Sequence, residues 1–205
     1  MSGARHPMAG VIASTGFASG DRVVVGHWHR SPIGPFSDVM WGRADGTRVL
    51  LSQDRRSEEL ITAVYEFDHC EVVPVQVRHE PRRLDLDAGP LRVTFVAGRL
   101  WPIPLRRPAW FTRLVEAPIA RATMGVRTYG VSPTGVREWY RADGYRRLLA
   151  VDGTNGGVGM GPFGPLDPPL GVGFTDPPGH PSLVLVRPLL QDPSGRLDQI
   201  VSRRR

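Results

Sequence analysis

One stretch of alternating residue types could carry acid–base chemistry. In Arg137-Glu138-Trp139-Tyr140-Arg141, an extended backbone sends Glu138 and Tyr140 to one face and the other three side chains to the opposite face. A carboxyl and a phenol that point into a cavity would form a polar pocket floor, able to donate or accept a proton. An exposed polar face with a tyrosine in the core is an equally good interpretation. Glu66, beside Tyr65, permits the same two interpretations.

Arginines near a proline-rich segment could bind an anion. Arg99, Arg106 and Arg107 flank the segment Trp101-Pro102-Ile103-Pro104. A guanidinium offers a planar, two-pronged donor that matches a carboxylate, although solvated arginines are common. No catalytic residue is assigned at this stage. The residues predicted to bind a ligand are Arg99, Arg106, Glu138, Tyr140 and Glu66.

The segment His27-Trp28-His29 is weak evidence for a metal-binding site. Two imidazoles two residues apart share one face of a strand and could ligate a metal ion. A metal centre needs further ligands, and no carboxylate follows before Asp38. His69, His79 or Cys70 would have to supply them from elsewhere in the chain. We therefore predict hydrogen-bonded histidines and no metal site.

The residues that are absent exclude several reaction classes. The chain contains no Lys, so it lacks the amine of a Schiff base, of a pyridoxal-phosphate anchor and of a P-loop. Gly159-Met160-Gly161-Pro162-Phe163-Gly164 matches a dinucleotide-binding pattern, but its proline forbids the helix that the pattern requires. We predict no cofactor. The single cysteine, Cys70, excludes an internal disulfide and favours a cytoplasmic protein.

The charge pattern argues against nucleic-acid binding. The 205 residues carry a net charge of +6, and Arg203, Arg204 and Arg205 supply half of it. Elsewhere arginines are dispersed among acids, whereas nucleic-acid readers cluster them on one face. No apolar run is long enough to span a membrane. We expect neither a nucleic-acid partner nor a membrane partner, and homo-oligomerisation is left open.

The periodicity of the sequence predicts many short strands and two helices. Residues 1–20 show neither period and are expected to form a flexible arm before a single domain at 21–200 and a basic tail at 201–205. Asp45-Gly46 and Ala142-Asp143-Gly144 predict tight turns between strands. Residues 153–181 are rich in Gly and Pro and predict a long loop. Strands are predicted at 22–28, 36–41, 49–51, 70–77, 84–86, 91–95, 126–131, 136–140, 145–151 and 182–190, and helices at 54–65 and 109–123.

These elements indicate a mostly β fold of the β-rich α+β class. Frequent hairpins favour an antiparallel, barrel-like sheet. We expect a central cavity inside that sheet and about two helices flanking it.

Three short stretches resemble segments of acetoacetate-decarboxylase-like proteins. Ser31-Pro32-Ile33-Gly34-Pro35-Phe36 is similar to the S-P-x-G-P-[YF] segment of that family. Gly98-Arg99 followed by Pro104 resembles its G-R…P-K-K segment, and Ala122-Thr123-Met124-Gly125 resembles its A-T-M-G segment. The resemblance implies a β-barrel-like sheet that encloses a pocket, in agreement with the predicted strands.

The chain departs from the family at the nucleophile. The resemblance places the reactive lysine after Pro104, where this chain has Leu105, Arg106 and Arg107. A guanidinium stays protonated and cannot form an imine. Decarboxylation through a Schiff base is therefore excluded, while the pocket could serve another task.

Two functions fit these observations. The first is a barrel that binds a small carboxylate- or ketone-bearing metabolite, such as a small anionic metabolite held by Arg99 or Arg106, with Glu138 or Glu66 as an acid or base. The second is a non-catalytic module with a filled barrel that contacts another protein. Whether the protein is an enzyme stays open at this stage. A cavity lined by converging polar groups would favour the first, and a filled barrel with an exposed apolar patch the second.

Overall fold

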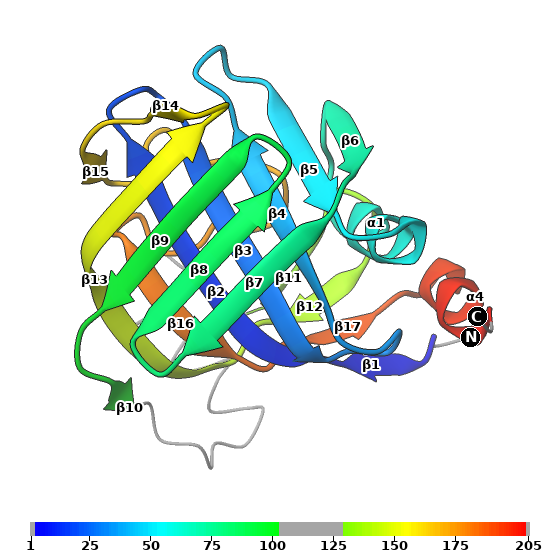
Figure 1. Cartoon of the computed structure of the whole chain (residues 1–205). Helices are drawn as coiled ribbons and strands as arrows, with labels where there is room; N and C mark the ends of the chain where they lie inside the picture. Colours follow the sequence, from blue (N-terminus) through cyan, green and yellow to red (C-terminus); the bar gives the residue numbers. More distant parts are fainter. Residues whose placement is uncertain (1–2, 103–128, 204–205) are drawn as a thin grey trace.

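Two β-sheets form most of the chain in this computed structural model, which describes residues 3–102 and 129–203. The larger sheet has the strand order β6-β5-β4-β3-β2-β16-β13-β9-β8-β7 (Figure 1). Its strands are β2 (Ala9–Phe17), β3 (Arg22–Arg30), β4 (Phe36–Gly42), β5 (Arg48–Ser52), β6 (His69–Val72), β7 (Val75–Glu80), β8 (Arg83–Ala88), β9 (Leu91–Ala97), β13 (Ala142–Asn155) and β16 (Ser182–Val186). Neighbours are antiparallel except β5 and β6, which are parallel.

Short strands complete the architecture. On the larger sheet, β10 (Trp101–Pro102) and β14 (Val158–Gly159) pair with β13, and β15 (Phe163–Gly164) pairs with β2. The smaller sheet has the order β1-β17-β12-β11 and consists of β1 (Arg5–Pro7), β17 (Leu189–Gln191), β12 (Arg137–Trp139) and β11 (Tyr129–Val131). The mostly β fold class predicted from the sequence is confirmed.

The larger sheet curls into a half-barrel because its inner face is apolar from one end to the other. Val25 of β3 and Val39 of β4 belong to the same buried cluster as Leu84 of β8 and Phe95 of β9. Strands far apart in the hydrogen-bonded order therefore meet through their side chains, and Figure 1 shows β7, β8 and β9 facing β2, β3 and β4. Described side chains of this cluster occupy the space that the sheet encloses.

The expectation of a flexible arm at residues 1–20 is wrong for most of its length. Ala9–Phe17 form β2, which lies between β3 and β16 near the middle of the larger sheet. Ala13 is completely buried. Gly, Ala and Ser give this segment no hydrophobic periodicity, but they let neighbouring elements approach closely. A Cβ at Gly16 would lie 2.1 Å from the carbonyl oxygen of Pro165.

The first predicted Asp-Gly turn is confirmed, and the second is wrong. Gly46 takes φ 91° in the turn between β4 and β5, the backbone region that favours glycine. Asp45 keeps a negative φ, since no residue other than glycine is positive among those described. Ala142-Asp143-Gly144 instead begins β13, with a register shift against β16. The chain here passes from the smaller sheet to the larger one.

Helix α1 (Arg55–Thr62) confirms the prediction for 54–65. Asp54 accepts a hydrogen bond from Ser57 N while the Ser57 side chain accepts one from Asp54 N, a capping box that fixes the start of the helix. The helix buries Leu60 and Ile61. The predicted helix at 109–123 lies outside the described residues. No helix in the described ranges has the length and apolarity that crossing a membrane requires.

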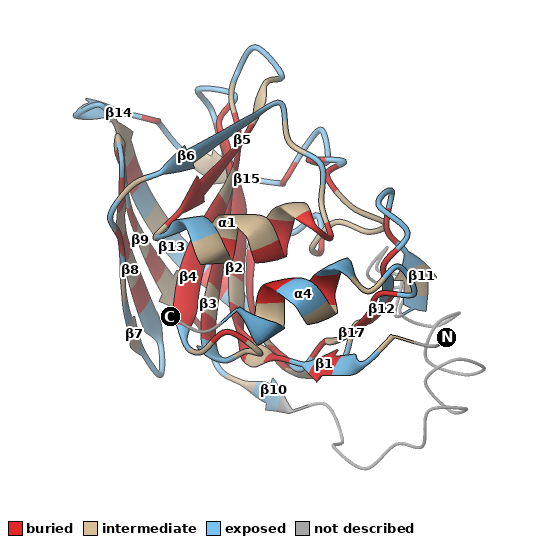
Figure 2. Ribbon diagram, turned by 90° about the vertical axis from the view of Figure 1, so that its right-hand side faces the viewer, coloured by how far each residue is buried: buried red, intermediate tan, exposed pale blue. Residues whose placement is uncertain are grey.

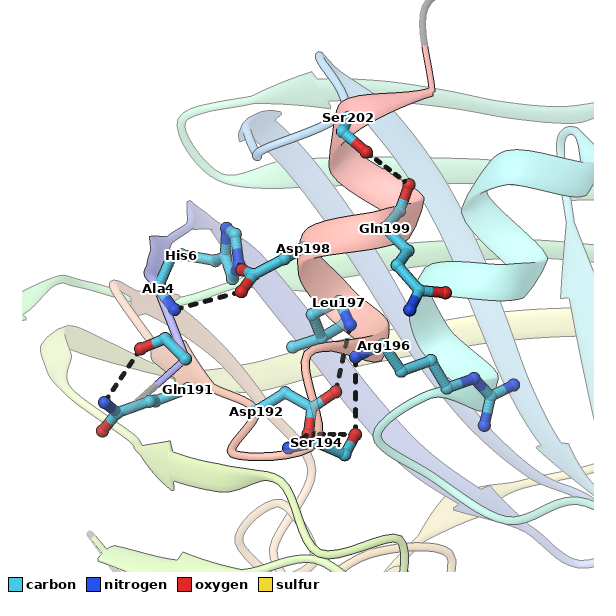
Figure 3. Close-up of polar contacts among 11 residues, drawn as sticks. Ala4, His6, Gln191, Asp192, Ser194, Arg196, Leu197, Asp198, Gln199 and Ser202 are labelled. Atoms are coloured by element: carbon cyan, nitrogen blue, oxygen red, sulfur yellow. Dashed lines mark hydrogen bonds and ion pairs between the residues drawn. The ribbon is translucent and has the colours of Figure 1, made fainter. Parts of the chain in front are cut away.

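A second described helix, α4 (Arg196–Ser202), was not predicted. It includes the first residues of the expected basic tail and packs beside α1 (Figure 2). Asp192 Oδ2 accepts a hydrogen bond from Leu197 N at 3.0 Å, and His6 Nε2 lies 2.7 Å from Asp198 Oδ1 (Figure 3). The helix is therefore held through contacts with β1 and with the end of β17, which sequence periodicity does not show.

The Gly/Pro-rich segment at 153–181 is packed against the fold. Besides the end of β13 it contains β14 and β15. Leu166, Leu170 and Val172 are buried with Val24 of β3 on the outer face of the half-barrel. The segment consequently covers part of that face.

The first prediction tests the central position of β2. Replacing Ala13 by Asp places a charge inside the cluster of described apolar side chains. We expect the free energy of unfolding to fall by about 3 kcal/mol or more, measured by urea denaturation. The matched control is Ala150→Asp on β13, at an exposed position, which should change stability by less than about 1 kcal/mol. Equal effects in the two variants would contradict the buried position of β2.

Candidate functional site

A buried carboxyl lies on the outer face of the half-barrel. Strand alternation turns Val25 of β3 inward, and turns Gly26 and Trp28 outward. Trp28 Nε1 donates a hydrogen bond to Asp38 Oδ1 of β4 at 2.8 Å. A Cβ at Gly26 would lie 2.6 Å from Asp38 Oδ1 and 2.7 Å from Trp28 Nε1. Glycine is therefore required beneath this hydrogen bond.

A second buried carboxyl comes from the smaller sheet. Glu138 lies on β12 and is 3% exposed. Tyr65, which follows α1, donates its hydroxyl to the Glu138 carboxylate and lies 3.0 Å from each of its oxygens. The Tyr65 ring lies against Gly173, where a Cβ would be 2.5 Å from Tyr65 Cδ1. The segment that covers the outer face thus fixes the ring of the hydrogen-bond donor.

These groups line one cavity of about 50 Å³. Asp38, Glu138 and Asp176 contribute carboxyls, and Tyr65 and Tyr140 contribute phenols. The remaining walls are mostly apolar. They are Ile12, Val24, Gly26, Trp28, Met40, Leu170, Val172, Thr175 and Pro177. The cavity is far smaller than a typical pocket for a drug-sized ligand, so it suits a molecule of only a few non-hydrogen atoms.

Two buried polar atoms at the cavity have no hydrogen-bond partner in the described part of the chain. They are Asp38 Oδ2 and the hydroxyl of Tyr140. Leaving a buried polar group unpaired costs roughly 1–3 kcal/mol, and buried polar groups in proteins are nearly always paired. An unpaired donor and an unpaired carboxyl oxygen on one cavity are what a bound polar ligand would satisfy.

Burial shifts the ionisation of these groups. It raises the pKa of Asp38 to about 7, against the hydrogen bond from Trp28, which lowers it. It also raises the pKa of Glu138 to about 7, against the hydrogen bond from Tyr65. Burial likewise raises the pKa of Asp176, and that of Tyr140 well above its usual range. Near neutral pH, Asp38 and Glu138 can therefore each take up or release a proton.

The structure brings together only part of the predicted site. Glu138 and Tyr140 both line the cavity. This agrees with the interpretation in which the two side chains point into a pocket. Arg99 and Glu66 are exposed and are not among the described lining residues. Arg106 lies outside the described residues. No basic side chain lines the cavity within the described ranges.

Sequence reasoning missed Asp38, Tyr65 and Asp176. Asp38 follows the turn between β3 and β4, residues 31–35, in which Gly34 has φ 97°. An acidic residue two positions inside a strand of otherwise apolar and small residues was the available signal for Asp38. Tyr65 was noted only as the neighbour of Glu66. The partners of these side chains come from distant elements.

The histidines of β3 make no metal centre with the described residues. His27 Nδ1 lies 2.9 Å from Ser37 Oγ, within hydrogen-bond distance. Within residues 3–102 and 129–203, no three His, Cys, Asp or Glu side chains are placed to share a metal ion.

No protein-family model matches the chain, and no curated protein matches it. Its structure is similar to one from structural studies of acetoacetate decarboxylase, with 10% sequence identity, 92% of this chain and 85% of the other covered, and a TM-score of 0.43. It is also similar to acetoacetate decarboxylase from Legionella pneumophila subsp. pneumophila strain Philadelphia 1, with 8% identity, 92% and 82% covered, and a TM-score of 0.39. Both similarities concern overall architecture and say nothing of a ligand.

The second prediction tests the packing beneath the site. Gly26→Ala introduces a Cβ that collides with the Trp28–Asp38 hydrogen bond. We expect the free energy of unfolding to fall by about 1–3 kcal/mol and the indole N–H resonance of Trp28 to shift in NMR spectra. The control is Gly164→Ala on β15, where a Cβ meets nothing within 4 Å. An unchanged Trp28 resonance in Gly26→Ala would show that the hydrogen bond does not lie over Gly26.

Proposed function

We propose that the protein binds a small ketone-bearing metabolite in the cavity of Asp38, Glu138 and Tyr140, without Schiff-base chemistry. The observation that carries this proposal is the buried hydroxyl of Tyr140, which has no partner among the described residues. A carbonyl oxygen is an acceptor that this donor would satisfy. The absence of Lys from the chain supports a reaction or binding mode without an imine.

Between the ketone and the carboxylate of the sequence-based hypothesis, the cavity favours the ketone. An anionic ligand would lie beside Asp38, Glu138 and Asp176, and like charges at close range in a poorly solvated site repel strongly. The described lining contains no guanidinium to compensate. A neutral carbonyl compound avoids this repulsion and still accepts a hydrogen bond from Tyr140.

The chemistry that the site could perform is proton transfer. Glu138, with a pKa of about 7, would act as a general base on a carbon acid next to the carbonyl group. Tyr140 would donate a hydrogen bond to the carbonyl oxygen as negative charge develops on it. Tyr65 would hold the Glu138 carboxylate in position. Enolisation of a small ketone uses these roles and requires no cofactor.

The second candidate is a protein-interaction module. Two observations favour it: the interior of the half-barrel is filled with apolar side chains, and Trp101 and Leu149 are 69% and 59% exposed. The two candidates differ in what they predict for the outer-face cavity. Only the first requires that a small molecule enter it.

The third prediction tests the ligand. Acetone and other small ketones at millimolar concentration should shift NMR resonances of cavity residues, and Tyr140→Phe should weaken their binding by about 3- to 10-fold through the lost hydrogen bond. The matched control is Tyr129→Phe, on an exposed side chain of β11, which should bind as the unaltered protein does. Acetate at the same concentrations should bind more weakly than acetone. Equal binding by Tyr140→Phe, or tighter binding of acetate, would contradict the proposal.

The fourth prediction concerns pH. Because the pKa values of Asp38 and Glu138 are raised on folding to about 7, the folded state holds their protons more tightly than the unfolded state does. Stability is then highest below about pH 4 for these groups and falls as pH rises to about 7, by roughly 3 kcal/mol for each.

Denaturation at several pH values measures this dependence. Asp38→Asn and Glu138→Gln should each flatten the profile between about pH 4 and pH 7. The control Asp152→Asn alters an exposed carboxyl. Its dependence of stability on pH should match that of the unaltered protein. A profile that Asp38→Asn and Glu138→Gln leave unchanged would show that these two carboxyls are not buried.

A further inference from the structure

A second cluster of titratable side chains lies on the opposite face of β3 from the cavity. His27 precedes Trp28 and therefore points to the inner side of the half-barrel, and His29 lies near enough to His27 to affect its ionisation. The register confirms this placement, because Val25, two residues before His27, is in the interior cluster. His27 pairs with Ser37 of β4, and its Nδ1 lies 2.9 Å from Ser37 Oγ.

Two other strands bring side chains to the same end of the interior. Arg146 of β13 pairs with Leu183 of β16, a residue of the interior cluster. His79 of β7 pairs with Leu84 of β8, which is in that cluster too. Directly paired residues share a face of the sheet. The ring centroids of His27 and His79 are 6.1 Å apart, so β3 and β7 meet here across the half-barrel.

We call His27, His29, His79 and Arg146 the basic cluster. His27, His79 and Arg146 are half-buried, and His29 is exposed. The guanidinium of Arg146 is oriented by donating from Nη1 to the carbonyl oxygen of Gly98 at 2.9 Å. This hydrogen bond leaves its other N–H groups to be satisfied elsewhere.

No described carboxylate neutralises the basic cluster. Within residues 3–102 and 129–203, none of its four members forms an ion pair with Asp or Glu. The acid next to it on β7 is Glu80, which pairs with Arg78 at 2.9 Å. The turn after β7 adds a further cation, Arg82, whose Nε donates to the carbonyl oxygen of Ala97.

The pKa shifts of the imidazoles agree with a cluster of basic groups that has no neutralising acid. Burial lowers the pKa of His27, and so do the charges of His79 and His29. Burial lowers the pKa of His79, and so do Arg146 and His29. An anion placed among these groups would have the opposite effect, because it favours the charged form of each imidazole.

We propose that the basic cluster, at this end of the half-barrel, is a binding site for a phosphate-type oxyanion. A guanidinium and two imidazoles from three strands offer convergent N–H donors, and a tetrahedral oxyanion accepts several such bonds at once. The alternative of a metal ion is disfavoured because the fixed charge of Arg146 repels cations. The site is separate from the acidic cavity, which lies on the other face of β3, and it does not depend on the function proposed for that cavity.

Inorganic phosphate is the first probe, with methyl phosphate as the ester and acetate as a carboxylate. Binding is measured by isothermal titration calorimetry at constant ionic strength. We expect phosphate to bind, and Arg146→Gln to weaken the affinity by tenfold or more. The matched control is Arg147→Gln, the next residue of β13, which is exposed and on the other face. It removes the same charge from the protein and should retain phosphate affinity within about twofold.

The imidazole resonances of the unaltered protein provide a test that needs no variant. Titration by NMR in chloride and then in phosphate should show the pKa of His27 and His79 rising in phosphate, while the resonances of His180, outside the basic cluster, do not respond to phosphate. If methyl phosphate binds as phosphate does, the site accepts esters, and if it does not, the ligand is the free anion.

Three results would overturn the proposal. One is no saturable phosphate binding up to the millimolar range. Another is equal loss of affinity in Arg146→Gln and Arg147→Gln, which would indicate a general effect of net charge. The last is acetate binding as tightly as phosphate, which would indicate a carboxylate site.

Discussion

Both faces of β2, β3 and β4 are buried, and the rest of the structure depends on this constraint. An antiparallel sheet usually leaves one face to water, but here alternate residues on both sides are apolar. The inner face is covered because the sheet curls on itself and brings β8 and β9 against it. The outer face needs separate elements, and it is covered by the smaller sheet, α1, α4 and the segment that contains Leu170 and Val172.

Covering the outer face forces carboxyl groups out of water. Asp38 is on the outer side of β4, and Glu138 approaches from β12, so neither can reach solvent once the covering elements are in place. Each is held by one aromatic donor, Trp28 or Tyr65. Burial without a cation favours the neutral acid, and this is why both groups titrate near neutral pH. Two buried carboxyls whose pKa values are raised to about 7 therefore follow from how the sheet is covered.

Strand β3 separates two groups of polar side chains of opposite character. Its outer side chains reach the acidic cavity, while His27 on its inner side belongs to the basic cluster. The layer between them is one strand thick, and the cavity walls and the interior cluster are both rich in apolar side chains. The arginine and the acids predicted to share one pocket do not meet. Arg99 is exposed in the loop between β9 and β10, whereas Glu138 is buried on β12.

Local chemistry in the sequence was sufficient for much of the fold. β-Branched residues predicted the strand around Val23–Val25, and alternation predicted the strand at Leu91–Phe95. Asp54 marked the start of α1, and Gly46 marked the first turn. Local chemistry did not predict β2 and α4, because these two elements depend on contacts with other segments. The small residues of β2 carry no period because neighbouring backbones need the space, and α4 depends on Asp192 and on the distant His6.

The sequence by itself determined which chemistry is available: no lysine for an imine, a single cysteine, and a strand on which Glu138 and Tyr140 share a face. The tertiary structure alone decided which face is buried and which groups meet there. Tyr65 reaches Glu138 across 73 positions of the chain, and Asp38 joins them from β4. Such contacts depend on how distant segments pack, and the sequence around each residue gives no signal of them.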